Sequence, residues 1–253
     1  MNGWKVLVAL SFVVPFHGAH ATSVVYFEAG GVGADQMRAA LSSLGPGFTV
    51  TDASSAAVFQ SDISSGSYDI GIFLVDSGAS SSYSAAINAL GTFVASGGRG
   101  IYSDMSGNSS LAAQFKVSFR SDTNFSAMDV PTPLSAYLST PTNIGLINPG
   151  YSVYSIGQTG LSGSVELAYN PLNALDATIT GGNLESGAYH SVVNGFANGT
   201  VAGSQGVQLY VNEIEFLAGQ PLTQVPLPAA LPLLVSGLLS FLGIGARYRR
   251  AAA

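Results

Sequence analysis

The feature that most constrains the fold is an apolar run in the N-terminal half, Tyr68 to Val75 (YDIGIFLV). Because almost every side chain in it is apolar, a strand formed there must be buried on both faces. Such strands are typical of parallel sheets covered by helices, since parallel neighbours need crossover connections. The run therefore predicts the central strand of an α/β sheet.

The segments around this run alternate between strand and helix patterns. β-branched and aromatic residues predict strands at 23–27, 48–51, 100–103 and 191–194, and apolar periodicity predicts helices after Asp35 and at 56–64, 83–94 and 204–218. Asp35 can cap the first helix. From Val117 to about residue 190 the pattern is broken by prolines, and its strand-like stretches, 151–156 and 164–169, leave the topology open. We predict a doubly wound, mostly parallel sheet with an irregular β-containing insertion.

The N-terminus has the pattern of a secretory signal peptide over residues 1–21. Lys5 precedes an apolar stretch at 6–16, and residues 19–21 form an A-x-A cleavage site. An uncleaved anchor is the alternative. Cleavage would leave one secreted α/β domain over residues 22–219, a size that one domain with a full core commonly has.

The C-terminus has the pattern of a membrane anchor. Residues 220–228 form a linker and a short proline-rich motif, residues 229–246 carry no charge, and residues 247–253 are basic. The apolar stretch makes a helix of about 27 Å, close to the roughly 30 Å of a hydrocarbon core, and arginines favour the cytoplasmic side. An ordinary tail anchor or a buried core helix are the alternatives.

The order of motif, span and basic end resembles the PEP-CTERM class of exosortase sorting signals, in its VPLPA variant. The residues that carry the likeness are Val225, Pro226, Leu227, Pro228 and Ala229, followed by Arg247, Arg249 and Arg250. The resemblance implies export through the inner membrane of an exopolysaccharide-producing Gram-negative bacterium, a membrane-held precursor, and delivery to the cell surface or extracellular matrix. The implied partners are an exosortase-type enzyme, the membrane and extracellular polysaccharide.

Composition excludes several classes of function. Between the terminal segments lie four basic and fourteen acidic side chains, a formal charge of −10. Such a surface repels phosphate backbones, so we expect no nucleic-acid partner. The chain has no cysteine, which excludes disulfides, thiolate metal sites and a cysteine nucleophile.

The domain also resembles, more weakly, the class I glutamine amidotransferase-like fold, a flavodoxin-like three-layer sandwich. The likeness lies in YDIGIFLV, in a helix ending FVASGG, in the strand GIYSDMSG and in NEIEFL of the last helix. It implies a tight elbow, here near Asp104 to Gly107, that in active relatives presents a catalytic cysteine served by a histidine. With no cysteine in the chain, that chemistry is not carried over, and we assign no catalytic residue.

A serine could in principle replace the missing nucleophile. Ser103 and Ser106 stand near the elbow, but the domain has one histidine, His190, and no G-x-S-x-G motif. We interpret His190 as a surface or capped loop residue. The glycines after the first strand lack dinucleotide-binding spacing and predict a tight turn.

A cluster of acids is the remaining candidate site. Glu28, Asp52, Asp76 and Asp104 each fall at or just past the end of an expected parallel strand, the edge where open α/β sheets bind ligands. In a flavodoxin-like strand order the first and third strands are neighbours, which places Glu28 beside Asp76, with Asp104 one strand away. The three could hold Ca²⁺ weakly. The alternative is that these acids cap helices, and we commit to no metal and no cofactor.

Our leading hypothesis is a secreted, non-catalytic domain that binds or builds part of the cell envelope or extracellular matrix. The rivals are an envelope glycan hydrolase that uses two carboxylates, a catalytically degenerate amidotransferase-like domain, and a passive spacer.

Overall fold

The computed structural model of the chain describes residues 21–129, 143–150, 152–182 and 190–219. The expected signal peptide, apart from Ala21, and the sorting motif, membrane span and basic tail lie outside these residues. Among the helices described, none is both long enough and apolar enough to cross a membrane.

The N-terminal half alternates strand and helix, as the sequence predicts. Its elements are β1 (Thr22–Ala29), α1 (Gln36–Ser43), β2 (Phe48–Asp52), α2 (Ala56–Ser64), β3 (Ile70–Val75), the 3₁₀ turn η1 (Ser80–Tyr83), α3 (Ser84–Ala95) and β4 (Arg99–Asp104). All residues of β3 are buried, which agrees with a central strand. The predicted cap of α1 is confirmed, since Asp35 accepts a hydrogen bond from the backbone N–H of Arg38.

The second half is built mainly from strands. Its elements are α4 (Ser109–Ala112), η2 (Ala113–Phe115), β5 (Val117–Thr123), β6 (Ala127–Asp129), β7 (Asn143–Gly145), β8 (Ile156–Gly160), β9 (Val165–Asn170), β10 (Asn173–Gly182), β11 (Ser191–Asn194) and α6 (Gln205–Ala218). The prediction of a strand at 151–156 is wrong for residues 152–155, because β8 begins only at Ile156. The backbone before it is held by Asn124, whose Oδ1 accepts the N–H of Tyr154 and whose own N–H donates to Ser155.

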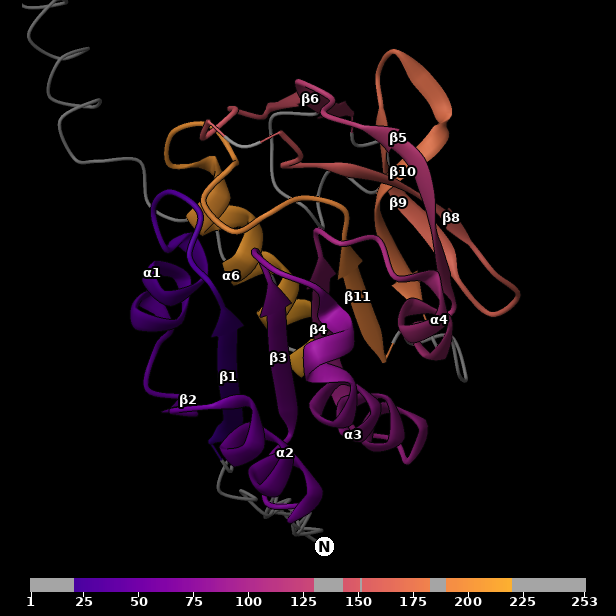
Figure 1. Cartoon of the computed structure of the whole chain (residues 1–253). Helices are drawn as coiled ribbons and strands as arrows, with labels where there is room; N and C mark the ends of the chain where they lie inside the picture. Colours follow the sequence, from indigo (N-terminus) through magenta and orange to yellow (C-terminus); the bar gives the residue numbers. More distant parts are fainter. Residues whose placement is uncertain (1–20, 130–142, 151, 183–189, 220–253) are drawn as a thin grey trace, which may run out of the picture.

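One mixed sheet runs through the domain in the order β2-β1-β3-β4-β11-β10-β9-β6-β7 (Figure 1). The strands from β2 to β11 in this order are mutually parallel, and those from β10 onward join antiparallel. β5 and β8 pair with each other, and β8 also pairs with β10. The parallel part has the flavodoxin-like order, with the first and third strands adjacent.

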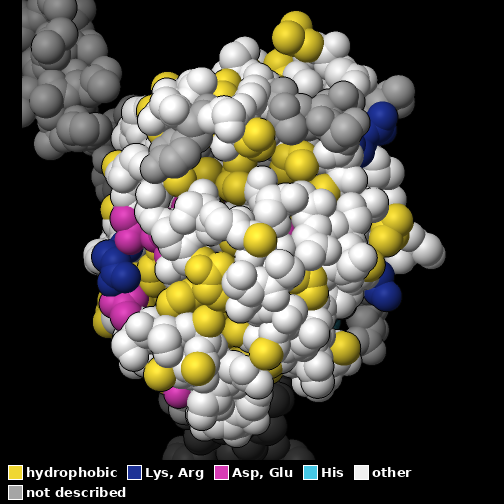
Figure 2. All heavy atoms as spheres, viewed as in Figure 1, with side chains coloured by type: hydrophobic (Ala, Val, Ile, Leu, Met, Phe, Trp, Pro, Cys, Tyr) yellow, Lys and Arg dark blue, Asp and Glu magenta, His cyan; other side chains and the backbone are white. Residues whose placement is uncertain are grey.

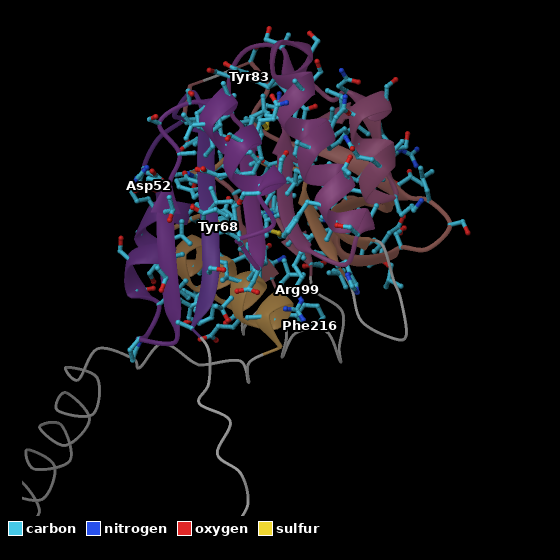
Figure 3. The ribbon with its side chains drawn as sticks, turned by 90° about the horizontal axis from the view of Figure 1, so that it is seen from below. Asp52, Tyr68, Tyr83, Arg99 and Phe216 are labelled. Atoms are coloured by element: carbon cyan, nitrogen blue, oxygen red, sulfur yellow. The ribbon has the colours of Figure 1, made fainter. Side chains whose placement is uncertain are left out.

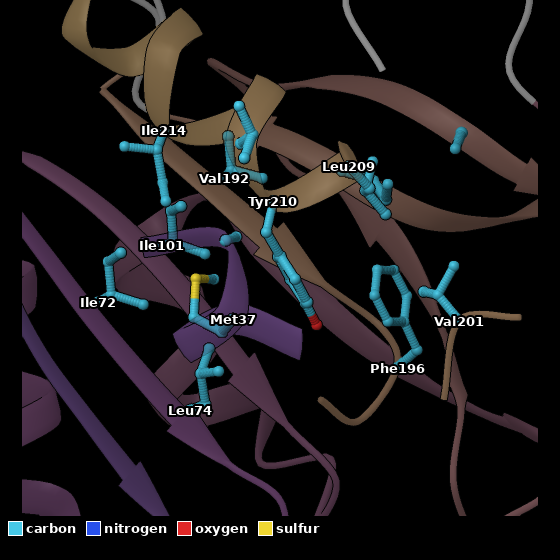
Figure 4. Close-up of a cluster of buried hydrophobic side chains, with 14 of the residues drawn as sticks. Met37, Ile72, Leu74, Ile101, Val192, Phe196, Val201, Leu209, Tyr210 and Ile214 are labelled. Atoms are coloured by element: carbon cyan, nitrogen blue, oxygen red, sulfur yellow. The ribbon is translucent and has the colours of Figure 1, made fainter. Parts of the chain in front are cut away.

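Side chains alternate between the two faces of the sheet along each strand, so a strand of apolar residues needs cover on both faces. Helices provide this cover on both faces of the parallel part. α1 and α6 pack on one face and α2 and α3 on the other. Figure 4 shows the α1 and α6 side, where Met37 of α1 and Tyr210 of α6 meet Ile72 and Leu74 of β3. The same core continues into the second half through a set of buried apolar residues, Phe125, Met128, Ile144, Leu146, Tyr154, Leu167 and Ile179.

α6 runs antiparallel to the parallel strands. It begins after the loop that leaves the carboxyl end of β11 and ends near the start of β4, where Phe216 lies beside Arg99 (Figure 3). Gly219 ends the helix in the left-handed conformation, with φ 72°, which favours glycine. The C-terminal end of the described domain therefore lies at the amino edge of the sheet.

Candidate functional site

The carboxyl edge of the parallel strands brings together two of the predicted acids. Glu28 on β1 pairs in register with Leu74 on β3, and Asp76 follows two residues later, on the same face of the sheet as Leu74. The two carboxyl groups lie close enough for a hydrogen bond, which would require one of them to carry a proton. The prediction that Glu28 lies beside Asp76 is thus confirmed.

Asp76 is the more deeply buried partner, with 4% of its surface exposed. Burial raises its pKa well above the usual range, and the hydrogen bond and negative charge of Glu28 raise it further. The backbone N–H of Asn198 opposes this effect by donating to Asp76 Oδ2 at 3.0 Å. Asp76 therefore stays protonated to a higher pH than an ordinary aspartate.

Asn198 organises the site, although the sequence marks it only as the first residue of an N-x-T sequon, which predicts no more than a polar loop. It lies in the loop between β11 and α6, with 1% of its surface exposed. Its Nδ2 donates to Asp35 Oδ1 at 2.8 Å, and its Oδ1 accepts the backbone N–H of Met37 at 2.9 Å. One side chain thereby ties the last loop of the sheet to the start of α1.

A partly exposed ion pair borders the acid pair. Arg38 contacts the carboxylates of both Asp35 and Asp52, and its guanidinium lies 5.3 Å from the ring centroid of Tyr26. The Tyr26 hydroxyl donates to Glu28 Oε2 at 2.7 Å and to Asp35 Oδ1 at 3.2 Å. Asp52, the last residue of β2, therefore lies at the rim of the sheet, where Figure 3 also places it. Away from such rims, Figure 2 shows a face with few charged side chains.

Asp104 does not join Glu28 and Asp76, contrary to the arrangement expected from the sequence. It pairs in register with Val75, one residue before Asp76, so the pleat directs it to the opposite face. There it accepts hydrogen bonds from the Tyr102 hydroxyl, from Ser106 N and Oγ, and from Asn108 N. Asp104 thus stabilises its own turn, in keeping with the capping alternative.

The elbow after β4 is closed by its own hydrogen bonds. Ser106 Oγ donates to Asp104 Oδ1 at 2.6 Å and lies 2.8 Å from the hydroxyl oxygen of Ser80, whose backbone N–H also donates to it. Ser103 is buried beneath α6 with 1% of its surface exposed. Neither serine has a histidine partner among the described residues.

His190 lies at the other edge of the sheet. It immediately precedes β11, and its carbonyl accepts the N–H of Gly100 at the start of β4. Because Ser103 pairs with Asn194, four residues of extended chain, about 13 Å, separate His190 from the level of Ser103. His190 therefore cannot act as a base for a serine at the elbow.

The glycines after β1 form a tight turn, as predicted. Gly30 has φ 77°, and a Cβ there would lie 1.8 Å from Ser77 Oγ. Gly33, with φ 75°, approaches the carbonyl of Gly199 in the Asn198 loop. The turn thus serves the close packing of two loops.

A second buried carboxyl group lies on the buried face of α6 and was not found from the sequence. Glu213 is fully buried, accepts a hydrogen bond of 3.0 Å from Asn194 Nδ2, and has its pKa raised to about 8 by burial. Its Oε1 and Asn194 Oδ1 have no hydrogen-bond partner in the structure. The apolar stripe of α6 predicted a core helix but not this acid within its buried face.

The described residues contain no group of three or more Asp, Glu or His side chains placed to hold a metal ion. Glu28 and Asp76 lie instead at the ends of two neighbouring strands, beside the loop that carries Asn198.

Comparison with known proteins identifies the fold but no family. No family model and no curated protein matches the sequence. Among solved structures, the chain is similar to a protein from Thermoplasma acidophilum described as a GMP synthase subunit, with a TM-score of 0.53 and 10% sequence identity, over 79% of this chain and 96% of that chain. At this identity the similarity shows the fold alone, a mixed α/β architecture with a mostly parallel central sheet, consistent with the flavodoxin-like fold that the sequence suggested.

Proposed function

We propose that the protein is exported to the cell envelope or extracellular matrix of a Gram-negative bacterium and sorted by an exosortase-type enzyme. The support is the C-terminal sequence: the motif at 225–229, the uncharged stretch at 229–246 and the arginines that follow. The precursor would be held in the inner membrane by this stretch. Extracellular polysaccharide is the partner that such a location offers.

We further propose that the α/β domain is a binding or structural module without catalytic activity. The observation that carries this proposal is the separation of His190 from the elbow by the length of the strands. At the elbow, the hydroxyl group of Ser106 donates a hydrogen bond to Asp104. The chain also has no cysteine. The groups needed for amidotransferase-like chemistry are therefore not assembled.

The rival function, hydrolysis of envelope glycans by two carboxylates, requires carboxyl groups roughly 5 to 10 Å apart across an open cleft. Glu28 and Asp76 are in hydrogen-bond contact and closed over by Asn198. This pair leaves no space for a sugar or a water between the two groups, which favours the non-catalytic module.

Fractionation tests the first proposal. The full chain and a variant ending at Gln224 are expressed in a host with and without an exosortase. We expect the full chain in the inner-membrane fraction without the enzyme and the truncated variant in the soluble periplasm. Replacement of Arg247, Arg249 and Arg250 by glutamine is the matched control for the charge contribution. Identical fractionation of the full and truncated chains would reject the proposal.

Turnover assays test the second proposal. The purified protein is expected to hydrolyse no ester, amide or glycan substrate above background. Hydrolysis that disappears in Ser106→Ala, but persists in the neighbouring surface variant Ser110→Ala, would overturn the non-catalytic assignment.

A further inference from the structure

We propose that Glu28 and Asp76 share one proton, and that this proton keeps the loop at 195–203 closed over the carboxyl edge of the sheet. The proposal concerns a pH-sensitive latch and goes beyond the export and binding roles above. We call residues 195–203 the Asn198 loop.

The latch joins parts of the chain that are far apart in sequence. Asn198 donates its backbone N–H to Asp76 after β3 and its side-chain N–H to Asp35 before α1. Its side-chain oxygen accepts the N–H of Met37 in the first turn of α1. Two separate segments, the turn after β3 and the start of α1, thus depend on the position of one asparagine.

A second set of contacts holds the Asn198 loop against the turn after β1. Gln36 Nε2 donates to the carbonyl of Val201 at 2.7 Å. A Cβ added at Gly199 would lie 2.3 Å from the Val32 carbonyl oxygen and 2.4 Å from the Ala34 carbonyl oxygen. The two loops therefore meet backbone to backbone, so any movement of the Asn198 loop uncovers the edge beneath it.

The proton is required because Asp76 lacks enough donors to be stable as an anion. Oδ2 accepts the N–H of Asn198, whereas Oδ1 is buried and has no hydrogen-bond partner. A buried carboxylate with an unsatisfied oxygen beside a second carboxylate is unfavourable. Protonation of one member turns the repulsive pair into a hydrogen bond.

The surrounding charged and titratable groups do not replace this proton. Tyr26 faces the pair from β1, Asp35 from the following turn and Tyr210 from α6, and Glu213 lies near Tyr210. The cation near this cluster, Arg38 on α1, already contacts Asp35 and Asp52. Ionisation of both Glu28 and Asp76 would thus place two adjacent negative charges close to that of Asp35.

The sign of the pH dependence follows from burial, because the closed loop buries Asp76 and burial, the largest cause of its raised pKa, outweighs the Asn198 N–H, which lowers that pKa. Opening leaves Glu28 beside Asp76 but returns solvent to it, so closed protein binds up to one proton more than open protein between the two pKa values of Asp76. The latch is therefore most stable in acid, and the closed-to-open ratio falls about tenfold per pH unit through that window, then levels off. Opening exposes the carboxyl edge, where open α/β sheets bind ligands.

The test measures amide hydrogen exchange of the full-length protein across a pH series, with rates corrected for the intrinsic pH dependence of exchange. Peptides covering the Asn198 loop are compared with peptides covering β3. Asp76→Asn is the informative variant, because an amide can donate to Glu28 and still accept from Asn198, as protonated Asp76 does. Glu28→Gln, which removes the second charge, is an independent variant, and Asp62→Asn on α2 is the matched control.

We expect protection of the Asn198 loop to fall by up to about tenfold per pH unit in the wild type and in Asp62→Asn. In Asp76→Asn it should stay constant. In Glu28→Gln burial still raises the pKa of Asp76 but the neighbouring charge is gone, so the fall should end at a lower pH than in the wild type. Protection of β3 should not follow the loop in any variant. Should Asp76→Asn fail to fold, Glu28→Gln decides alone. Loop protection that is independent of pH in the wild type, or a folded Glu28→Gln protein whose loop protection falls over the same pH range as in the wild type, would overturn the proposal.

Discussion

The backbone N–H of Asn198 donates a 3.0 Å hydrogen bond to Asp76, which lies 122 positions earlier in the chain. The contact fastens the last loop of the sheet to the end of its central strand. Because Asp76 also bonds Glu28, the same contact joins β1, β3 and the segment after β11 at one edge. The first prediction follows from this arrangement.

Asn198→Ala should destabilise the domain by about 2–3 kcal/mol, because it removes two buried side-chain hydrogen bonds and leaves the N–H of Met37 without its acceptor. Urea unfolding followed by circular dichroism measures the loss. The matched control is Asn148→Ala, which removes one exposed hydrogen bond to Gly150 and should cost well under about 1 kcal/mol. Equal losses in the two variants would contradict the central role given to Asn198.

Glu213→Gln should make folding less sensitive to pH. With its pKa raised to about 8, Glu213 is protonated in the folded protein at neutral pH, so the folded state binds more protons than the unfolded chain. The stability that it contributes is fully present below the ordinary glutamate pKa and is lost as pH rises through about 8, at up to about 1.4 kcal/mol per pH unit.

Chemical denaturation at a series of pH values compares the wild type with Glu213→Gln. The difference between the two curves isolates Glu213, because the Asp76 pair is common to both. Asp62→Asn should reproduce the wild-type curve. A parallel pair of curves for the wild type and Glu213→Gln would show that Glu213 is ionised in the folded protein.

Calcium should give little stabilisation. A site with a Kd of about 10⁻⁴ to 10⁻³ M would add roughly 1.4–2.7 kcal/mol at ~10 mM Ca²⁺. Asp104, however, faces away from Glu28 and Asp76, and burial keeps the pKa of Asp76 well above its usual range, which disfavours a carboxylate ligand there. We therefore expect thermal melting to shift equally, or not at all, in the wild type and in Glu28→Gln/Asp76→Asn. A shift of that size confined to the wild type would establish a cation site at this pair.

The strands and helices of the first half could be predicted because each depends on local pattern. The apolar run around Ile72 and the cap at Asp35 indicate their elements without knowledge of distant contacts. In the second half, β9 and β10 pair antiparallel with register shifts, and β6 and β7 are only three residues long. Such pairings are set by tertiary contacts and leave a weak signal in the sequence.

The candidate site was predictable only in part, and the reason is geometric. The proximity of Glu28 and Asp76 follows from the order of the strands in the sheet, and the alternation of strands and helices along the sequence predicts that order. The direction of Asp104 depends on its register with Val75, where a shift of one residue reverses the face. Asn198 lies in a loop, so no periodicity marks it, and its role appears only when the loop meets α1.

The course of α6 determines how the domain would be presented at a membrane. The helix ends beside the start of β4, at the edge of the sheet opposite Glu28 and Asp76. An anchor that continues from this end, as we propose, tethers the domain by its amino edge. The latched edge then points outward from the bilayer, accessible to soluble polymers and remote from lipid headgroups.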